Sequence, residues 1–176
     1  MNVYLALKQL PGIKIIDVQG LVRQVRKDNV VWQSNKDVRE ILSNFNMIKC
    51  DQLELNYITN STNRNKSIDQ LMRYGIEEII VTNGSHGSTI YSKSEGELNI
   101  PSFKPNRFKD TTGCGDTFTA IYAYSRLRDY PIYEAGLFAS AGASLKIEHV
   151  GPLSTSIERI KEKIEKHYKK RSLQLI

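Results

Sequence analysis

The sequence predicts an α/β protein with a parallel central sheet flanked by helices. A short apolar run rich in β-branched residues at 13–18 is typical of a buried strand, 47–56 holds a second strand candidate, and 77–84 is a third buried strand. Helix-like segments at 36–45 and 65–75 separate these runs, and such alternation indicates parallel strands joined by crossover helices. The 176 residues suffice for one sizeable core, so we expect a single domain over 1–176.

The remaining elements follow from local signals. The second helical segment ends at Gly75, a natural C-terminal stop. Two shorter runs, 88–92 and 96–101, flank a turn at 93–96 and predict a hairpin. Three helices finish the chain, at 114–128, 132–147 and 155–170, with prolines at 131 and 152 between them.

Composition and charge exclude some classes of protein. No apolar run is long enough to cross a bilayer, and the N-terminus lacks the pattern of a signal peptide, so we expect a cytoplasmic protein without membrane contact. The net charge of +6 is concentrated in the last helical segment. That segment has apolar residues at helical spacing and acids among its bases, which favours a solvated amphipathic helix over nucleic-acid binding. The two cysteines, Cys50 and Cys114, have no metal-site or disulfide spacing and are expected to pack.

The stretch "DTTGCGDTF" (110–118) carries the strongest chemical signal. Gly113 and Gly115 allow unusual backbone angles just before an apolar helix pattern. The free N–H groups of a first helical turn attract anions, so Gly113, Cys114, Gly115 and Asp116 could surround a phosphoryl group. Asp116 would then either cap the helix or take a proton from an attacking hydroxyl, and the spacing alone does not decide between these roles.

A second glycine-rich stretch, "VTNGSHGSTIY" (81–91), places Thr82, Gly84 and Gly87 directly after a buried strand. By itself it could be an ordinary turn entering the hairpin. Ligands of open α/β sheets bind beyond the carboxyl ends of strands, however. Together with the loop at Asp116, this position favours a nucleotide site.

Taken together, these stretches resemble the ribokinase-like (pfkB) sugar and nucleoside kinases. "DTTGCGDTF" is similar to the family signature D-T-x-G-A-G-D-x-F, with Cys114 in place of alanine. "VTNGSHG" resembles the nucleotide loop T-x-G-x-x-G, and "IIDVQGLVR" resembles a strand with a D-x-Q-G-x-x-R variant. "CDQLELNYIT" resembles the strand ending in N-x-x-E, with Asn56 at the Asn position, and "FASAGASLKIEHVG" resembles the late helix that borders the adenine.

The resemblance implies a Rossmann-like, ribokinase-like fold and ATP-dependent phosphorylation of a hydroxyl on a sugar or nucleoside. Asp116 would be the catalytic base, and the backbone of Gly113, Cys114 and Gly115 would form the anion hole with it. Mg²⁺ would accompany ATP. The resemblance assigns further residues to the nucleotide and to a monovalent cation such as K⁺. The nucleotide residues would be Asn56, Thr82, Gly84, Gly87 and Ser140, and the cation residues Asp110 and Thr112 with the loop near Gly151.

Departures from the family pattern define two alternatives. Thr59 stands where the N-x-x-E glutamate would organise magnesium, and Ser140 replaces an asparagine. The N-terminal half of the family fold, with its first strands, lid and acceptor motif, has no counterpart in these residues. We therefore expect either a kinase that needs a partner half or a non-catalytic nucleotide-binding fragment. An exposed sheet edge would favour a homo-oligomer or a partner chain.

Overall fold

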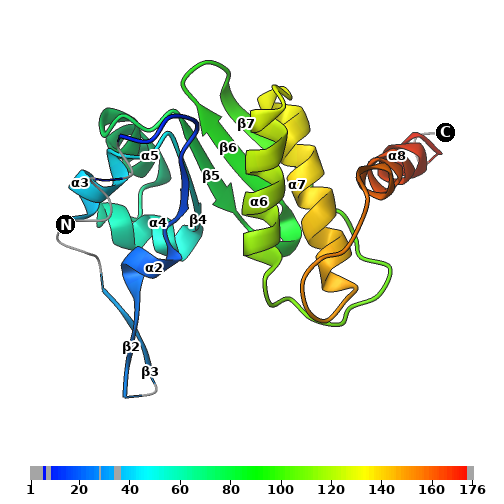
Figure 1. Cartoon of the computed structure of the whole chain (residues 1–176), viewed down its shortest axis with the longest axis horizontal. Coiled ribbons are helices and arrows are strands. Elements are labelled where there is room, and N and C mark those ends of the chain that lie inside the picture. Colours follow the sequence, from blue (N-terminus) through cyan, green and yellow to red (C-terminus); the bar gives the residue numbers. More distant parts are fainter. Residues whose placement is uncertain (1–5, 7–8, 28, 34–36, 174–176) are drawn as a thin grey trace. The chain divides into compact units, whose positions relative to one another are not determined.

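The computed structural model describes residues 6, 9–27, 29–33 and 37–173 (Figure 1). Backbone contacts divide the chain into two compact units. Unit 1 comprises residues 1–83 and 89–98, and unit 2 comprises residues 84–88 and 99–176. The expectation of a single domain over 1–176 stays a prediction.

A five-stranded sheet forms the frame of unit 1, in the order β1-β4-β5-β6-β7. Its strands are β1 (Ile15–Asp17), β4 (Met47–Asp51), β5 (Glu78–Thr82), β6 (Ser88–Ser92) and β7 (Gly96–Ile100). The first residue of β6 and the last two of β7 are counted with unit 2. The first three strands are parallel, with Ile48 paired to Ile16 on one side and to Ile79 on the other. A turn at 93–95 joins β6 and β7, so the predicted α/β class and the hairpin are both confirmed.

The helices of unit 1 lie between these strands in the chain. They are α2 (Gln19–Val22), α3 (Val38–Leu42), α4 (Gln52–Thr59) and α5 (Arg64–Arg73). Apolar residues from these helices and from β4 and β5 form one buried cluster, which includes Leu42, Leu55 and Leu71. The predicted helix at 36–45 corresponds to the shorter α3, and its first residue lies outside the described residues.

One predicted strand is too long. We expected a strand over 47–56, but β4 ends at Asp51 and α4 begins at the next residue. The cause is a capping box, in which the Asp51 carboxylate accepts from the Glu54 N–H at 2.8 Å and the Glu54 carboxylate accepts from the Asp51 N–H at 2.7 Å. These two bonds satisfy donors that the first helical turn would otherwise leave free.

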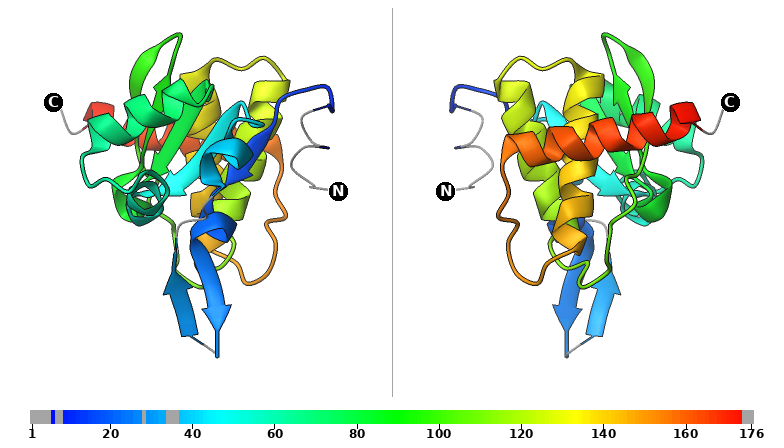
Figure 2. Two further views of the ribbon diagram at one scale, coloured as in Figure 1. Left: turned by 90° about the vertical axis from the view of Figure 1, so that its left-hand side faces the viewer. Right: turned by 90° about the vertical axis from the view of Figure 1, so that its right-hand side faces the viewer.

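A second sheet was not predicted. It is the antiparallel hairpin of β2 (Arg23–Arg26) and β3 (Asn29–Trp32), which extends away from the rest of unit 1 (Figures 1 and 2). Val25 is 77% exposed and Val30 58% exposed. Since neither valine reaches a core, the segment lacks the buried alternation by which strands are recognised.

Three long helices form most of unit 2, together with the short 3₁₀ helix η1 (Gly84–His86). They are α6 (Cys114–Leu127), α7 (Ile132–Ile147) and α8 (Ile157–Leu173), so the three predicted helices are confirmed to within three residues at each end. Helices α6 and α7 lie side by side, and α8 crosses α7 (Figure 2). None of the helices that the structure describes has the length and apolar character needed to cross a membrane.

Candidate active site

The start of α6 has the geometry of an anion-binding helix N-terminus. Gly113 precedes the helix in the left-handed conformation, with φ 77° and ψ 8°, and has no side chain to cap it. The Cys114 N–H donates to the Thr111 carbonyl at 3.1 Å, and the first regular helical bond runs from the Thr117 N–H to the Gly113 carbonyl. Within the described residues, the N–H groups of Gly115 and Asp116 have no recorded acceptor, and donors of this kind attract anions.

A cavity of about 660 Å³ in unit 2 brings several predicted residues together. Asp110, Thr112, Gly113 and Asp116 line it, and so does Gly151 from the loop after α7. The Asp116 side chain is exposed and within reach of this cavity. Asp116, which carries both a carboxylate and a free N–H group, thus faces this cavity, an arrangement suited to proton removal next to a bound phosphoryl group.

Asp110 is held by two partners. One carboxylate oxygen accepts from the Thr112 N–H at 2.9 Å, and the other lies 3.4 Å from the Lys146 ammonium. The Thr112 backbone and side-chain bonds, with help from Lys146, lower the pKa of the Asp110 carboxyl below its usual range. Asp110 is therefore an ionised, oriented carboxylate at the entrance to α6.

Lys146 is a residue that sequence analysis missed. It lies near the end of α7, its side chain is only 3% exposed, and it lines the same cavity as Asp110. Lysine is almost never buried without a partner. The one signal in the sequence was a lysine within the otherwise small and apolar stretch 138–147.

Cys114 lies in the first turn of α6 and is partly buried. Its Sγ atom is 3.9 Å from the Ala143 carbonyl. Burial raises the pKa of the Cys114 thiol, and the nearby Lys146 charge only partly opposes this. A neutral thiol in a packed position agrees with the predicted packing role.

The predicted nucleotide loop is fixed in unit 2 by a close backbone approach. Gly87 has φ +89°, and a Cβ atom there would lie 2.2 Å from the Ile100 carbonyl oxygen. The Ser102 hydroxyl donates to the Ser85 carbonyl at 2.6 Å, and the Ser140 hydroxyl donates to the Pro101 carbonyl at 2.7 Å. Segment 100–102 therefore connects the loop of Gly84 and Gly87 to Ser140 on α7.

Two other predicted residues belong to unit 1. Thr82 is the last residue of β5, and its hydroxyl donates to the Cys50 carbonyl at 3.3 Å. Asn56 does not end a strand as expected but lies inside α4, where it hydrogen-bonds with Gln52. Thr59 is buried in the same helix and donates to the Leu55 carbonyl, so the proposed N-x-x-E register does not lie at a strand end.

Asp51 and Glu54, where β4 ends and α4 begins, have the spacing of the N-x-x-E motif, with Asp in place of Asn. Glu54 is 2% exposed, and one of its oxygens lies 2.9 Å from the Arg23 guanidinium. Arg23 also contacts Asp51 at 3.2 Å and stacks on the Trp32 ring. Burial raises the pKa of the Glu54 carboxyl, although the Asp51 N–H opposes this. Sequence analysis missed this pair because the apolar residues around it made the predicted strand continue to residue 56, past Asp51 and Glu54.

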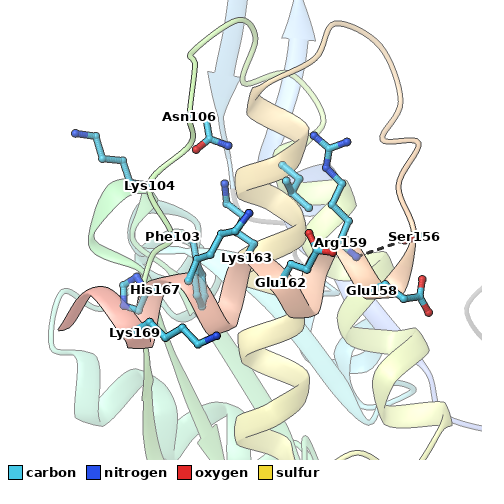
Figure 3. Close-up of a pocket in the computed structure, with 12 residues that line it drawn as sticks. Phe103, Lys104, Asn106, Ser156, Glu158, Arg159, Glu162, Lys163, His167 and Lys169 are labelled. Carbon is cyan, nitrogen blue, oxygen red and sulfur yellow. Dashed lines mark hydrogen bonds between the residues drawn. The ribbon is translucent and has the colours of Figure 1, made fainter. Parts of the chain in front are cut away.

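A second cavity in unit 2, of about 710 Å³, lies between α8 and the segment around Phe103 (Figure 3). It contains none of the predicted site residues. Side chains of both charges line it, among them Glu158, Glu162 and Lys169 (Figure 3), and Lys163 is paired with Glu148 at 2.9 Å. Burial raises the pKa of Glu148, but the Asn106 N–H and Lys163 outweigh it and hold that pKa below its usual range. The mixed charge is what the sequence predicts for this helix, and the expectation that nucleic acid is not its ligand stays a prediction.

An α/β sheet and an anion-binding helix N-terminus are features that many phosphate-binding proteins share. A family model for the pfkB family carbohydrate kinases matches residues 14–159. The chain therefore belongs to the pfkB carbohydrate kinase family, as the sequence motifs predict.

Individual relatives agree with this assignment. The chain is 30% identical over 137 residues to a nucleoside kinase of Methanocaldococcus jannaschii, a match that covers 76% of the chain and 44% of the relative. It is 26% identical over 166 residues to a ribokinase of Arabidopsis thaliana, covering 90% of the chain and 44% of the relative. The chain thus spans less than half the length of these curated relatives.

Solved structures show the same fold. An Arabidopsis thaliana ribokinase complexed with ribose and ATP matches with a TM-score of 0.75 at 22% identity, over 93% of this chain and 51% of that one. A pyrophosphate-dependent kinase in the ribokinase family, complexed with a pyrophosphate analog and myo-inositol, matches with a TM-score of 0.74 at 25% identity. That match covers 93% of this chain and 57% of the other. This half of the ribokinase fold is therefore present.

Proposed function

We propose that this chain supplies the catalytic and nucleotide-binding part of an ATP-dependent kinase that phosphorylates a hydroxyl of a sugar or nucleoside. The observation that carries the proposal is the start of α6, where Gly113 leaves the Gly115 and Asp116 N–H groups available beside the Asp116 carboxylate. Family membership supports the same reaction class.

In the proposed reaction, Asp116 accepts the proton of the acceptor hydroxyl as its oxygen attacks the γ-phosphorus of ATP. The bond between that phosphorus and the bridging oxygen breaks, and ADP leaves with the electron pair. The N–H groups of Gly115 and Asp116 stabilise the charge on the transferred phosphoryl group. The Cys114 N–H contributes less, because it already donates to Thr111.

For the nucleotide, we propose the loop of Gly84 and Gly87 with Thr82 and Ser140. A Mg²⁺ ion would neutralise phosphate charge when bound with ATP. All four carboxylate oxygens of Asp51 and Glu54 already accept or pair, which does not suit direct coordination. Mg²⁺ usually keeps several waters and binds through substrate phosphates. We therefore propose that Asp51, the more exposed of the two, orients such waters, in place of Asn56 and Thr59.

A second candidate is a nucleotide-binding chain without catalysis of its own. The observation that favours it is the length of the match, since the chain spans 44% of each relative named above. In the first candidate, the acceptor site comes from a partner chain, a second copy or a further segment. Titration calorimetry with ATP and Mg²⁺ separates the two candidates from an inert chain, because both require binding.

Catalysis is tested by ADP release with a panel of sugars and nucleosides, for the chain alone and mixed with the N-terminal half of a related kinase. We expect Asp116→Asn to lower turnover by roughly 10²–10⁴-fold while ATP still binds, because only proton transfer is lost. Asp129→Asn is the matched control, since Asp129 is an exposed turn residue in the same unit. Turnover in Asp116→Asn equal to that of the control would refute the catalytic role, and ATP binding without turnover in any mixture would favour the second candidate.

A further inference from the structure

Asp110 and Thr112 match a position that holds a monovalent cation in some members of the family. In this chain a cationic side chain already lies there. The Lys146 ammonium is 3.4 Å from a carboxylate oxygen of Asp110, 3.5 Å from the Asp110 carbonyl and 3.1 Å from the His149 carbonyl. Three oxygens thus surround one nitrogen, which matches the three N–H donors of an ammonium group.

We propose that the Lys146 ammonium replaces the monovalent cation in this chain, so that the site works without K⁺. This proposal rests on the proposed function for its place in the active site. It is argued from the contacts of Lys146, so it can be tested whether or not the chain catalyses a reaction. Carboxylate and carbonyl oxygens are ligands that both an alkali cation and an ammonium can use, and an ammonium carries the same single charge.

The residues present do not fit an added K⁺ ion. Lys146 is only 3% exposed, and its ammonium already uses the Asp110 carboxylate and two backbone carbonyls. A second cation would share one carboxylate with a buried like charge, and like charges that are shielded from water repel strongly. The Asp110 carboxylate is also used by Thr112, whose backbone N–H donates to it at 2.9 Å and whose side chain is hydrogen-bonded to it.

Lys146 also lies beside Gly113 of the proposed anion hole. Its Cε atom is 3.8 Å from the point where a Cβ atom on Gly113 would lie. Backbone bonds from the Lys109 and Asp110 N–H groups to the Ile147 carbonyl join the loop to the end of α7. The charge is therefore held beside the turn that starts α6, where it can stabilise both the turn and an anion bound there.

The first test uses the unchanged full chain. Its melting midpoint and its affinity for ATP with Mg²⁺ are measured in KCl, NaCl and choline chloride at equal ionic strength. We expect the same values in all three salts, because Lys146 supplies the charge. A midpoint or an affinity that rises specifically in K⁺ would overturn the proposal, whether or not the chain proves to be a kinase.

The second test removes the ammonium. We expect Lys146→Ala to lower the melting midpoint in choline chloride by roughly 5–15 °C, as loss of one member of a buried charge pair does in a chain of this size. K⁺ or NH₄⁺ should restore part of this loss, because either ion can occupy the vacated space beside Asp110. Lys163→Ala is the matched control, since Lys163 is 11% exposed and pairs with Glu148 at 2.9 Å. It should be destabilised without responding to K⁺.

A Lys146→Ala variant that melts identically in K⁺, NH₄⁺ and choline would overturn the proposal, and Lys146 would be a structural ion pair only. Equal rescue of Lys163→Ala by K⁺ would overturn it too, since the response would then be general. If Lys146→Ala does not fold in choline, refolding in K⁺ supports the proposal and failure in every salt counts against it. Lys146→Met, which keeps the apolar part of the side chain, should fold and show no K⁺ response.

Discussion

Substitution of Gly87 by alanine tests whether the predicted nucleotide loop is held by a backbone contact. The new Cβ atom would lie 2.2 Å from the Ile100 carbonyl oxygen and 3.0 Å from the Ser102 nitrogen, and both are backbone atoms that cannot rotate away. The positive φ of 89° adds a conformational cost of about 1–2 kcal/mol for a residue with a Cβ atom. Forced displacement of packed backbone adds about 1–3 kcal/mol. We therefore expect a total loss of about 2–5 kcal/mol in the free energy of unfolding.

The matched control is Gly151→Ala. Gly151 is in the same unit and has φ +82°, but a Cβ atom there would meet no atom within 4 Å. It should lose only the conformational part, about 1–2 kcal/mol. Urea unfolding followed by circular dichroism, which reports mainly on the helices, measures both variants. Equal losses for Gly87→Ala and Gly151→Ala would refute the reasoning, because the close approach to Ile100 would then cost nothing.

Three further predictions concern charge and hydrogen bonding. The pKa of Glu148 is lowered in the folded chain, so its carboxylate stabilises the fold above about pH 4.5, and this contribution is lost as the pH falls further. Glu148→Gln removes the titrating group and should therefore make the melting midpoint depend less on pH at acid pH. Arg23→Met leaves the buried Glu54 carboxylate without its partner and should cost about 1–3 kcal/mol in urea unfolding; an unchanged midpoint would contradict the ion pair. Thr59→Val breaks the bond to Ser67 and should cost about 1 kcal/mol without altering the Mg²⁺ dependence of ATP binding. Asp51→Asn should weaken that dependence, because Asp51 is the residue proposed to orient the waters of Mg²⁺. The reverse pattern in calorimetry would restore Thr59 to the metal-organising position.

Elements with strong local signals could be predicted from the sequence. The strands around Ile48 and Ile79 are buried and the strand around Ile16 is half-buried, and Gly113 and Pro131 directly precede the first two long helices of unit 2. The α6 loop could also be recognised, because two glycines, an aspartate and an apolar helix pattern lie within nine residues. In each case the physical cause of the structure is local in the chain.

Features that depend on tertiary contacts or on competing local signals could not be predicted. Val25 and Val30 pair across a hairpin without a core, so their alternation carried no burial signal. The strand at 47–56 was extended too far because the apolar residues of α4 resemble a strand until the Asp51 capping box is recognised. Lys146 meets Asp110 across 36 residues, and no spacing rule connects the two.

The contact between Gly87 and Ile100 also has a consequence for binding kinetics. A loop that is already held in one conformation loses little freedom when a ligand arrives, so less of the interaction energy is spent on ordering it. Association would then need no slow rearrangement of this loop, and differences in affinity among ligands would appear mainly in how quickly they dissociate. In this respect residues 84–88 should act as a preorganised platform and not as a mobile flap.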